Sequence, residues 1–372
     1  MLRVGIVGCG KISDAHVEQA RATGLAEVVA VADREPLMAQ QIAQRLGIEK
    51  RYTDVLTMIK EAKLDVIHVA TPPDSHLAIA RLALENGCHV FLEKPLALDT
   101  SQTQEILSLA EKVGRKVAVN YLYNFESPFK RLETLLAQGE LGEIVHIESA
   151  YGYDLNGEYG LAVLSDPKHW VHRLPGKLFH NVLDHVMCKI APFIGENFQT
   201  VALASRRRSP MGSEIVDALP DELRFILASD RVSVSGYISA HAKPVTHTLK
   251  VLGTRNSYLL DFVSRTCTPL ARQRFPGSIG RLIPAIDQAR SFSGEARSNF
   301  GAFWRHDYHF FIGMRRLLTA FYGSIMQGTA SPQKPAELLI ASKAIDAIVA
   351  SINTPKDAPK DTPNAQMEAL SL

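Results

Sequence analysis

Residues 4–13 read Val4-Gly5-Ile6-Val7-Gly8-Cys9-Gly10-Lys11-Ile12-Ser13. An apolar run ends in two glycines one residue apart, and an amphipathic stretch follows, as in the Gly-rich turn of a dinucleotide-binding βαβ unit. Gly8 permits the tight turn, and Gly10 lets the backbone approach a pyrophosphate at the N-terminus of the next helix. Ser13 stands where the fingerprint has a third glycine, and it is small enough for close packing of helix and strand. We therefore predict that Gly8, Gly10, Lys11 and Ile12 contact a dinucleotide.

A second apolar run supports this interpretation. Residues 28–32 are apolar and end at Asp33, about 20 residues beyond the turn, where the motif requires an acidic side chain. The Asp33 carboxylate can accept both ribose hydroxyls and repels a 2′-phosphate, which predicts NAD as the cofactor. Arg34 could stack on the adenine or reach a 2′-phosphate, so NADP stays open. The alternative is a glycine turn in another kind of α/β protein, followed by a solvated acid.

The composition is that of a two-domain globular protein. At 372 residues the chain exceeds what one hydrophobic core usually supports. A net charge of +2 gives no general attraction to nucleic acid or to membranes, and no apolar run approaches the length of a spanning helix. Met1 and Leu2 lead straight into the first apolar run, without a signal-peptide pattern. The four cysteines lack CxxC spacing, so we expect a reducing, cytoplasmic location.

Short apolar runs alternate with helical patterns up to about residue 120. We predict strands at 3–7, 28–33, 66–70, 89–93 and 116–119, and helices near 13–23, 36–46, 54–61, 75–86 and 100–113. Runs that are apolar throughout are typical of strands buried on both faces. The first domain, residues 1–122, is therefore predicted to be α/β, with a doubly wound parallel sheet.

The pattern changes beyond about residue 140. Strand-like segments follow one another without intervening helices, at 142–151, 201–207, 217–228, 231–240, 246–252 and 257–262. This order favours a large open sheet that is mostly antiparallel. Helices are expected near 178–194, 305–327 and 335–352. We predict an α+β domain over 123–352, which binds substrate and joins subunits, and a flexible tail over 353–372.

Ligands of a doubly wound sheet lie outside the carboxyl ends of its strands. The predicted strand ends place several polar or turn-forming residues there, in addition to the glycine turn and Asp33. These are Thr71, Pro72, Glu93, Lys94 and Asn120, which we assign to the cofactor site, followed by Tyr121.

The chain resembles the Gfo/Idh/MocA family, which includes glucose–fructose oxidoreductase and inositol dehydrogenase. The resemblance covers nearly the whole chain and rests on Gly8-Cys9-Gly10, Ala70-Thr71-Pro72-Pro73-Asp74-Ser75-His76, Glu93-Lys94-Pro95-Leu96-Ala97, Asn120 with Phe125 and Pro128, Leu141-Gly142-Glu143-Ile144 and Leu249-Lys250-Val251-Leu252-Gly253-Thr254. It implies a Rossmann domain followed by an α/β domain with a large open sheet. The outer face of that sheet commonly joins subunits, so a homodimer or homotetramer is expected.

The same resemblance implies an activity. Members usually oxidise or reduce one carbon of a sugar or cyclitol with NAD or NADP. The matched motifs add His76 to the expected cofactor site. They also imply a cis peptide between Lys94 and Pro95, which is the kind of bond where a cis form costs little.

Lys94 is the first predicted catalytic residue. It follows the apolar strand 89–92 and should emerge at the mouth of the crevice. A lysine held beside a cationic nicotinamide has a lowered pKa, which helps it to share the proton of an alcohol during hydride transfer. The alternative is a surface lysine that precedes a turn proline.

The resemblance implies a second catalytic pair, an aspartate four residues before a histidine. The best register places His185 at the histidine and Asn181 at the aspartate, on one face of a helix. Asparagine cannot act as a base, but it can orient a hydroxyl. The proton then falls to His185, to Lys94 or to both, while Asp184 lies off this face and is interpreted as structural. The alternative for His185 is a core or interface histidine.

Three other residues are candidate substrate contacts, namely Tyr121, Trp170 and Arg173, and packing roles compete with this interpretation. His169, His172, His180 and His185 are dense locally, but they lack compact ligand spacing, so no metal site is predicted.

Residues 264–305 are rich in arginine, and Arg206, Arg207 and Arg208 form a second basic cluster. A short helix near 281–291 is expected in the longer segment. One hypothesis is a flap or subunit contact that helps to bind an anionic sugar, such as a sugar nucleotide or a uronate. The favoured alternative is an oligomer-interface arm or a solvated loop.

Three functional classes stay open at this point. The leading one is a sugar or cyclitol dehydrogenase. The second is an NAD-dependent glycosidase that oxidises C3 transiently. The third is a catalytically silent NAD-binding regulator.

Overall fold

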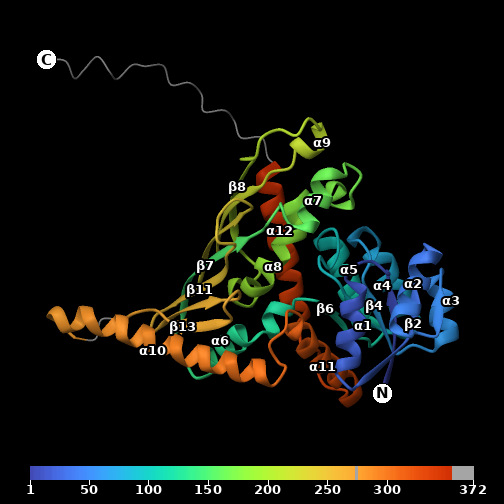
Figure 1. The fold of residues 1–372 in the computed structure, drawn as a ribbon, viewed down its shortest axis with the longest axis horizontal. Helices are drawn as coiled ribbons and strands as arrows, with labels where there is room; N and C mark the ends of the chain where they lie inside the picture. The colour runs from blue at the N-terminus through green and yellow to red at the C-terminus, as the bar shows by residue number, and fades with distance from the viewer. Residues whose placement is uncertain (273–274, 354–372) are drawn as a thin grey trace.

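The computed structural model describes residues 1–272 and 275–353, which form two regions built on separate sheets (Figure 1). The first sheet is parallel throughout and has the order β3-β2-β1-β4-β5-β6. Its strands are Leu2–Val7 (β1), Ala26–Ala32 (β2), Lys50–Tyr52 (β3), Val66–Val69 (β4), His89–Leu92 (β5) and Val117–Val119 (β6). This confirms the predicted doubly wound sheet. The short strand β3 was not predicted, because Lys50-Arg51-Tyr52 carries no apolar run.

The helices of the first domain lie between these strands. They are Ser13–Ala22 (α1), Pro36–Leu46 (α2), Val55–Ala62 (α3), His76–Glu85 (α4) and Thr100–Lys112 (α5), with short 3₁₀ turns at Pro73–Ser75 and Leu122–Phe125. Asp54 and Asp99 cap α3 and α5, because their carboxylates accept the backbone N–H groups of Thr57 and Gln102. Such caps satisfy N–H groups that a helix start leaves without partners.

The second sheet has seven strands in the order β13-β12-β11-β7-β10-β9-β8. They are Ile144–Gly152 (β7), Gln199–Ser205 (β8), Glu222–Ala228 (β9), Ser233–Ser239 (β10), His247–Gly253 (β11), Ser257–Asp261 (β12) and Thr266–Pro269 (β13). The pairing of β10 with β7 is parallel and the other pairings are antiparallel, which confirms the predicted mostly antiparallel sheet. The expected strand at 217–228 begins only at Glu222, because Glu214–Asp217 form the short helix α9.

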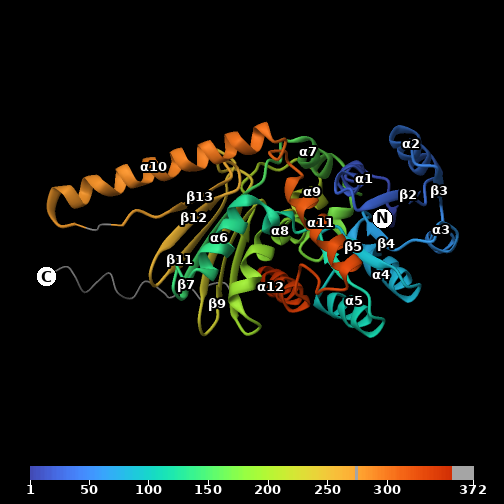
Figure 2. The same ribbon diagram turned by 90° about the horizontal axis from the view of Figure 1, so that it is seen from below.

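Helices cover one face of this sheet. Lys177–Ile194 (α8) and Pro335–Asn353 (α12) pack against each other and lie between the sheet and the first domain (Figure 1). The remaining helices of this part are Ser127–Ala137 (α6), Glu158–Ser165 (α7) and the 3₁₀ turn Trp170–Arg173. The opposite face of the sheet is not covered by helices of the described residues (Figure 2).

Helix α11 returns to the first domain although it follows the second sheet in the chain. It spans Ile312–Gln327 and contacts α1. Its buried residues Phe321 and Tyr322 share a hydrophobic cluster with Val4 and Ile6 of β1. The expected helix over 305–327 is therefore wrong at its start, since residues 305–311 connect two separate helices.

The arginine-rich segment forms the strand β13 and a long helix, α10, at Gly277–Trp304. The expected short helix near 281–291 is thus wrong: the periodic pattern continues for several more turns through Phe300 and Trp304. In Figure 2, α10 runs along the edge of the second sheet and extends beyond its strands, away from the first domain. Its outward side exposes a row of large apolar side chains, namely Ile279, Leu282, Ile286, Phe292, Phe300, Phe303 and Trp304.

Two further predictions concern the limits of the described residues and the membrane. Arg274 and nearly all of the predicted tail over 353–372 lie outside the described residues. Among the helices of the described ranges, none is both long enough and apolar enough to cross a bilayer.

Candidate cofactor and catalytic site

The glycine turn after β1 has the backbone that the motif requires. Gly8 has φ +93°, and a Cβ there would lie 2.8 Å from the backbone of Ala70. Only glycine fits this conformation and this close approach. Around Gly10 a Cβ would meet no heavy atom within 4 Å, which leaves the backbone open to a ligand. Ser13 is fully buried, and its hydroxyl donates to the carbonyl of Gly10.

Asp33 lies beside this turn at the end of β2. Its carboxylate accepts the N–H of Cys9 at 2.8 Å and the N–H of Glu35 at 2.9 Å. These bonds fix the carboxylate at the pocket and leave lone pairs for further donors. The pocket that it lines lies at the ends of β1, β2 and β4, and includes Gly8, Asp33, Arg34, Thr71, Pro72 and Arg173.

Lys11 and Ile12 occupy the start of the first crossover helix, beside the same turn. Lys11 is exposed, and its amine lies 2.5 Å from the carboxylate of Glu158 in the second domain. A second ion pair joins the domains nearby, where Arg173 lies 3.1 Å from Asp74. Arg173, which the sequence predicts as a substrate contact, lines the same pocket as Gly8 and Asp33.

The residues present fit a bound dinucleotide. The turn offers open backbone at Gly10, and the carboxylate of Asp33 faces the same pocket. At the end of β6, Asn120 is buried, yet its Oδ1 has no hydrogen-bond partner among the described residues. A buried acceptor without a partner is costly, and a polar ligand group would satisfy it.

Lys94 connects the two domains at this edge of the sheet. It follows β5, and its peptide bond to Pro95 is cis, as predicted. The amine donates to Oδ1 of Asn181 at 3.0 Å and to the carbonyl of the same residue at 3.2 Å. Burial lowers the pKa of this amine, and the negative charges of Glu93 and Asp184 oppose that effect. The structure thus brings Lys94 and Asn181 together from segments far apart in the sequence.

His185 lies one turn further along α8, on the same face as Asn181. Its ring stacks on Tyr151 with centroids 5.4 Å apart and meets the edge of Tyr123 at 5.5 Å. Burial, together with the charges of Lys94 and Lys189, holds the pKa of His185 well below its ordinary value. A neutral imidazole can accept a proton, whereas an imidazolium cannot.

Lys189 continues this face of α8 and was missed by sequence reasoning. It is fully buried, and its amine donates to the carbonyl of His185 and to Nε2 of His247, the latter at 2.7 Å. Burial lowers its pKa to about 8. The repeat of Asn181, His185 and Lys189 every four residues was a signal for a shared face that the sequence did contain.

Asp184 and Tyr121 form a buried pair behind the lysine. The hydroxyl of Tyr121 donates to Oδ1 of Asp184 at 2.5 Å. Burial raises the pKa of Asp184 to about 6, although Tyr121 and Lys94 oppose the shift. The hydroxyl of Tyr121 is therefore engaged in a hydrogen bond inside the protein.

The other predicted site residues have supporting positions. The ring nitrogens of His76 lie 2.8 Å from the carbonyl of Thr71 and 3.1 Å from that of Leu96, so this buried ring joins two loops of the pocket. Trp170 is half-buried against the core and contacts His169. Within the described residues, no group of three His, Cys, Asp or Glu side chains could hold a metal ion.

Several arginines of the two basic clusters are paired within the second domain. Arg206 and Arg208 form ion pairs with Asp217 and Asp221 of the second domain. Arg265 is buried against Glu126 and donates to the carbonyl of His309. Helix α10 extends away from the first domain (Figure 1), which does not support a flap that helps to bind a sugar there.

Comparison with known proteins agrees with this geometry. Residues 2–121 match the family described as "Oxidoreductase family, NAD-binding Rossmann fold". The chain is 34% identical over 144 residues to the D-glucoside 3-dehydrogenase of Escherichia coli K12. This alignment covers 38% of this chain and 41% of that protein. It is 24% identical over 219 residues to the inositol 2-dehydrogenase of Salmonella typhimurium LT2, which covers 58% of this chain and 61% of that one. The alignments thus span only about half of these relatives.

A solved structure matches over nearly the whole length. The NAD binding oxidoreductase from Klebsiella pneumoniae superposes with a TM-score of 0.75 at 21% identity, covering 95% of this chain and 97% of that chain. At this identity the likeness shows the fold. The description of the matched family agrees with the cofactor predicted from the glycine turn and Asp33, which is NAD.

Proposed function

Because residues 2–121 match the model of the Gfo/Idh/MocA oxidoreductase family, we propose that the chain is an NAD-dependent dehydrogenase. Its substrate is a sugar, a sugar derivative or a cyclitol, and a hydride moves between NAD and a secondary alcohol or ketone. One observation carries the proposal. The half-buried Lys94, at the end of β5, donates from its amine to Asn181, on the face of α8 that also bears His185.

The residues of the chain divide the work of binding and proton transfer. NAD, when bound, supplies the hydride acceptor. Asp33 accepts the ribose hydroxyls, while the open backbone at Gly10 receives the pyrophosphate. Asn181 cannot take a proton, so its amide orients the substrate hydroxyl and the amine of Lys94.

Lys94 and His185 handle the hydroxyl proton in this proposal. Burial lowers the pKa of Lys94 toward physiological pH, so a larger fraction of the amine is neutral and able to accept a proton. His185 is held neutral by burial and by the two flanking lysines, so it can accept a proton. The relatives named D-glucoside 3-dehydrogenase and inositol 2-dehydrogenase support a polyhydroxylated substrate.

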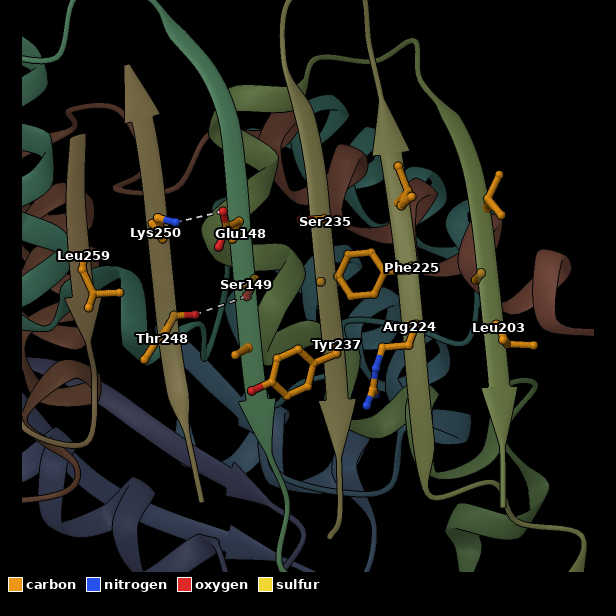
Figure 3. A pocket seen from close by; sticks show the side chains of 15 residues that line it. Glu148, Ser149, Leu203, Arg224, Phe225, Ser235, Tyr237, Thr248, Lys250 and Leu259 are labelled. Carbon is orange, nitrogen blue, oxygen red and sulfur yellow. Dashed lines mark hydrogen bonds and ion pairs between the residues drawn. The ribbon is translucent and has the colours of Figure 1, made fainter. Parts of the chain in front are cut away.

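The outer face of the second sheet supports assembly into a homodimer or homotetramer. Figure 3 shows the hollow across this face, with Leu203, Arg224 and Tyr237 on neighbouring strands. Val201 and Ile226 are more than half exposed there. Large apolar side chains that a monomer leaves in water are typical of a protein–protein contact. The exposed row on α10 continues this apolar character along one edge of the sheet and favours the interface-arm interpretation of residues 264–305.

A nicotinamide absorbance screen tests the proposed function. Purified protein is mixed with NAD and a panel of sugars, sugar derivatives and cyclitols, with the Lys94→Ala variant in parallel. We expect NADH to accumulate with at least one panel member, and we expect the variant to form no NADH with that compound. Glycoside cleavage without net NADH would identify the glycosidase alternative, and NAD binding without turnover across the panel would identify the regulator.

A further inference from the structure

A line of buried polar side chains runs from Glu93 into the core of the first domain. Oε1 of Glu93 lies 3.0 Å from Nε2 of His16, whose Nδ1 lies 3.0 Å from Nδ1 of His68. Nε2 of His68 lies 2.7 Å from the hydroxyl of Tyr322. The two histidines and the tyrosine are fully buried, and Glu93 is 8% exposed. The four residues come from α1, β4, the end of β5 and α11, so the line joins distant segments.

The direction of each hydrogen bond follows from the tyrosine. Burial holds the pKa of Tyr322 well above its ordinary value, so the hydroxyl keeps its proton. Among the described residues, His68 is the partner that the structure gives this hydroxyl. If Nε2 of His68 accepts, its proton is on Nδ1, which donates to Nδ1 of His16. His16 then carries its proton on Nε2 and donates to Glu93, so both rings are neutral.

The opposite order is less favourable. A cationic His16 would donate to Glu93 and to His68, and His68 would donate to Tyr322. The tyrosine hydroxyl would then lose the acceptor that the described residues provide, and a charge would sit on a ring with no exposed surface. That charge would also neutralise Glu93. The neutral order leaves the full negative charge of Glu93 beside Lys94.

Every other contact of Glu93 favours the ionised carboxylate. Asn120 donates to Oε1 at 2.6 Å, and the N–H of Lys94 donates to Oε2 at 3.2 Å. Burial acts to raise the pKa of Glu93, but its hydrogen bond and electrostatic attraction to His16, the charge of Lys94 and the hydrogen bond from Asn120 outweigh it. The titratable groups that face this carboxylate are His16, Lys94, His76 and Asp184.

We propose that His16, His68 and Tyr322 are positioning residues, whose one-directional chain of hydrogen bonds keeps Glu93 ionised and oriented beside Lys94. The charge of Glu93 opposes the effect of burial on the lysine amine, so the chain sets the pH range in which Lys94 exchanges its proton. This inference rests on the proposed role of Lys94. It gives α11 a direct connection to the site, although that helix lies far along the sequence.

The first test reads the histidines themselves and needs no enzymatic activity. NMR of the full chain with ¹⁵N-labelled histidine reports which ring nitrogens carry protons, and the variants His16→Gln and His68→Gln assign the two signals. We expect a neutral His16 protonated on Nε2 and a neutral His68 protonated on Nδ1. A doubly protonated His16, or a His68 protonated on Nε2, would overturn the inference whether or not the proposed reaction is correct.

The second test removes only the last donor. Tyr322→Phe removes the hydroxyl that donates to Nε2 of His68, so the order with two neutral rings is no longer favoured by that hydrogen bond. A cationic His16 then becomes less costly, and its charge would offset the charge of Glu93. The pKa of Lys94 then falls, and we expect the acidic limb of the kcat/KM profile to shift to lower pH without a change in NAD affinity. Phe321→Leu is the matched control, because Phe321 is equally buried on α11 and packs 6.1 Å from Phe91. An unmoved limb in Tyr322→Phe, or an equal shift in both variants, contradicts the proposal.

Discussion

Two surfaces of the molecule carry opposite kinds of side chain. At the carboxyl edge of the parallel sheet, Glu93 and Asn181 are buried and Lys94 is half-buried, and each is hydrogen-bonded to another of the three or to a neighbour. On the outer face of the second sheet, Val201 and Ile226 are large, apolar and exposed. Buried polar groups usually have hydrogen-bond partners or a functional role. A large apolar patch on the surface of a single chain is typical of a site that another molecule covers. The comparison supports our proposals that chemistry takes place at the first surface and assembly at the second.

The largest effect is expected at Lys94. Replacing it with alanine removes a proton-transfer group, which typically contributes about 10²–10⁴ in rate. We expect kcat to fall by about two orders of magnitude or more while NAD affinity changes little. Steady-state kinetics and NAD titration measure the two effects separately. Lys60→Ala on the exposed side of α3 is the control, and near-normal turnover in Lys94→Ala would refute the assignment.

His185 and Asn181 should separate two roles on one helix face. His185→Ala should lower kcat by about two orders of magnitude, because a base is lost. Asn181→Ala should act mainly on the KM for the sugar, since an amide orients but does not exchange protons. The wild-type enzyme should lose activity at low pH, where Lys94 and His185 are both protonated. A pure KM effect in His185→Ala would show that the histidine has a packing role.

A smaller effect is expected for cofactor choice at Asp33. Its carboxylate should favour NAD over NADP, and Asp33→Ala should reduce that preference by about tenfold or more, given about 1.5 kcal/mol for one hydrogen bond to a charged group. Titration of both cofactors against the wild type and the variant measures the change. Tighter binding of NADP than of NAD by the wild type would contradict the prediction.

The smallest catalytic effect is expected on the second surface. Ile226→Asp places a charge on the outer face of the sheet, which should weaken assembly while kcat stays near the wild-type value. Sedimentation of the variant at several concentrations measures the oligomeric state. Leu37→Asp on α2, which replaces another exposed apolar side chain, should leave assembly intact. If both variants assemble like the wild type, the outer face is not the interface.

The parallel sheet and its glycine turn could be predicted because their signals are local. Strands buried on both faces are continuous apolar runs, and Gly8 and Asp33 stand at fixed spacing. Strand β3 escaped detection for the opposite reason, because Lys50-Arg51-Tyr52 is a strand only through its pairing with β2. The full length of α10 was missed although its apolar row continues through Phe300 and Trp304.

The candidate site was predictable only in its motif-bearing parts. Lys94, Asn181 and His185 stand in recognisable segments, and the four-residue spacing on α8 could have added Lys189. The partners His16, His68 and Tyr322 could not be assembled from the sequence, because their contacts span up to 254 positions along the chain. Such contacts depend on the packing of α11 against the first domain, and no local pattern encodes that packing.

The most direct test of the role of Lys94 is a single-turnover measurement of hydride transfer. Wild-type protein and Lys94→Ala are mixed with saturating NAD and the substrate found in the screen, and NADH absorbance is followed through the first turnover. We predict that the variant slows this step by about two orders of magnitude or more. An unchanged first turnover, with only later turnovers slowed, would contradict the assignment of proton transfer to the amine of Lys94.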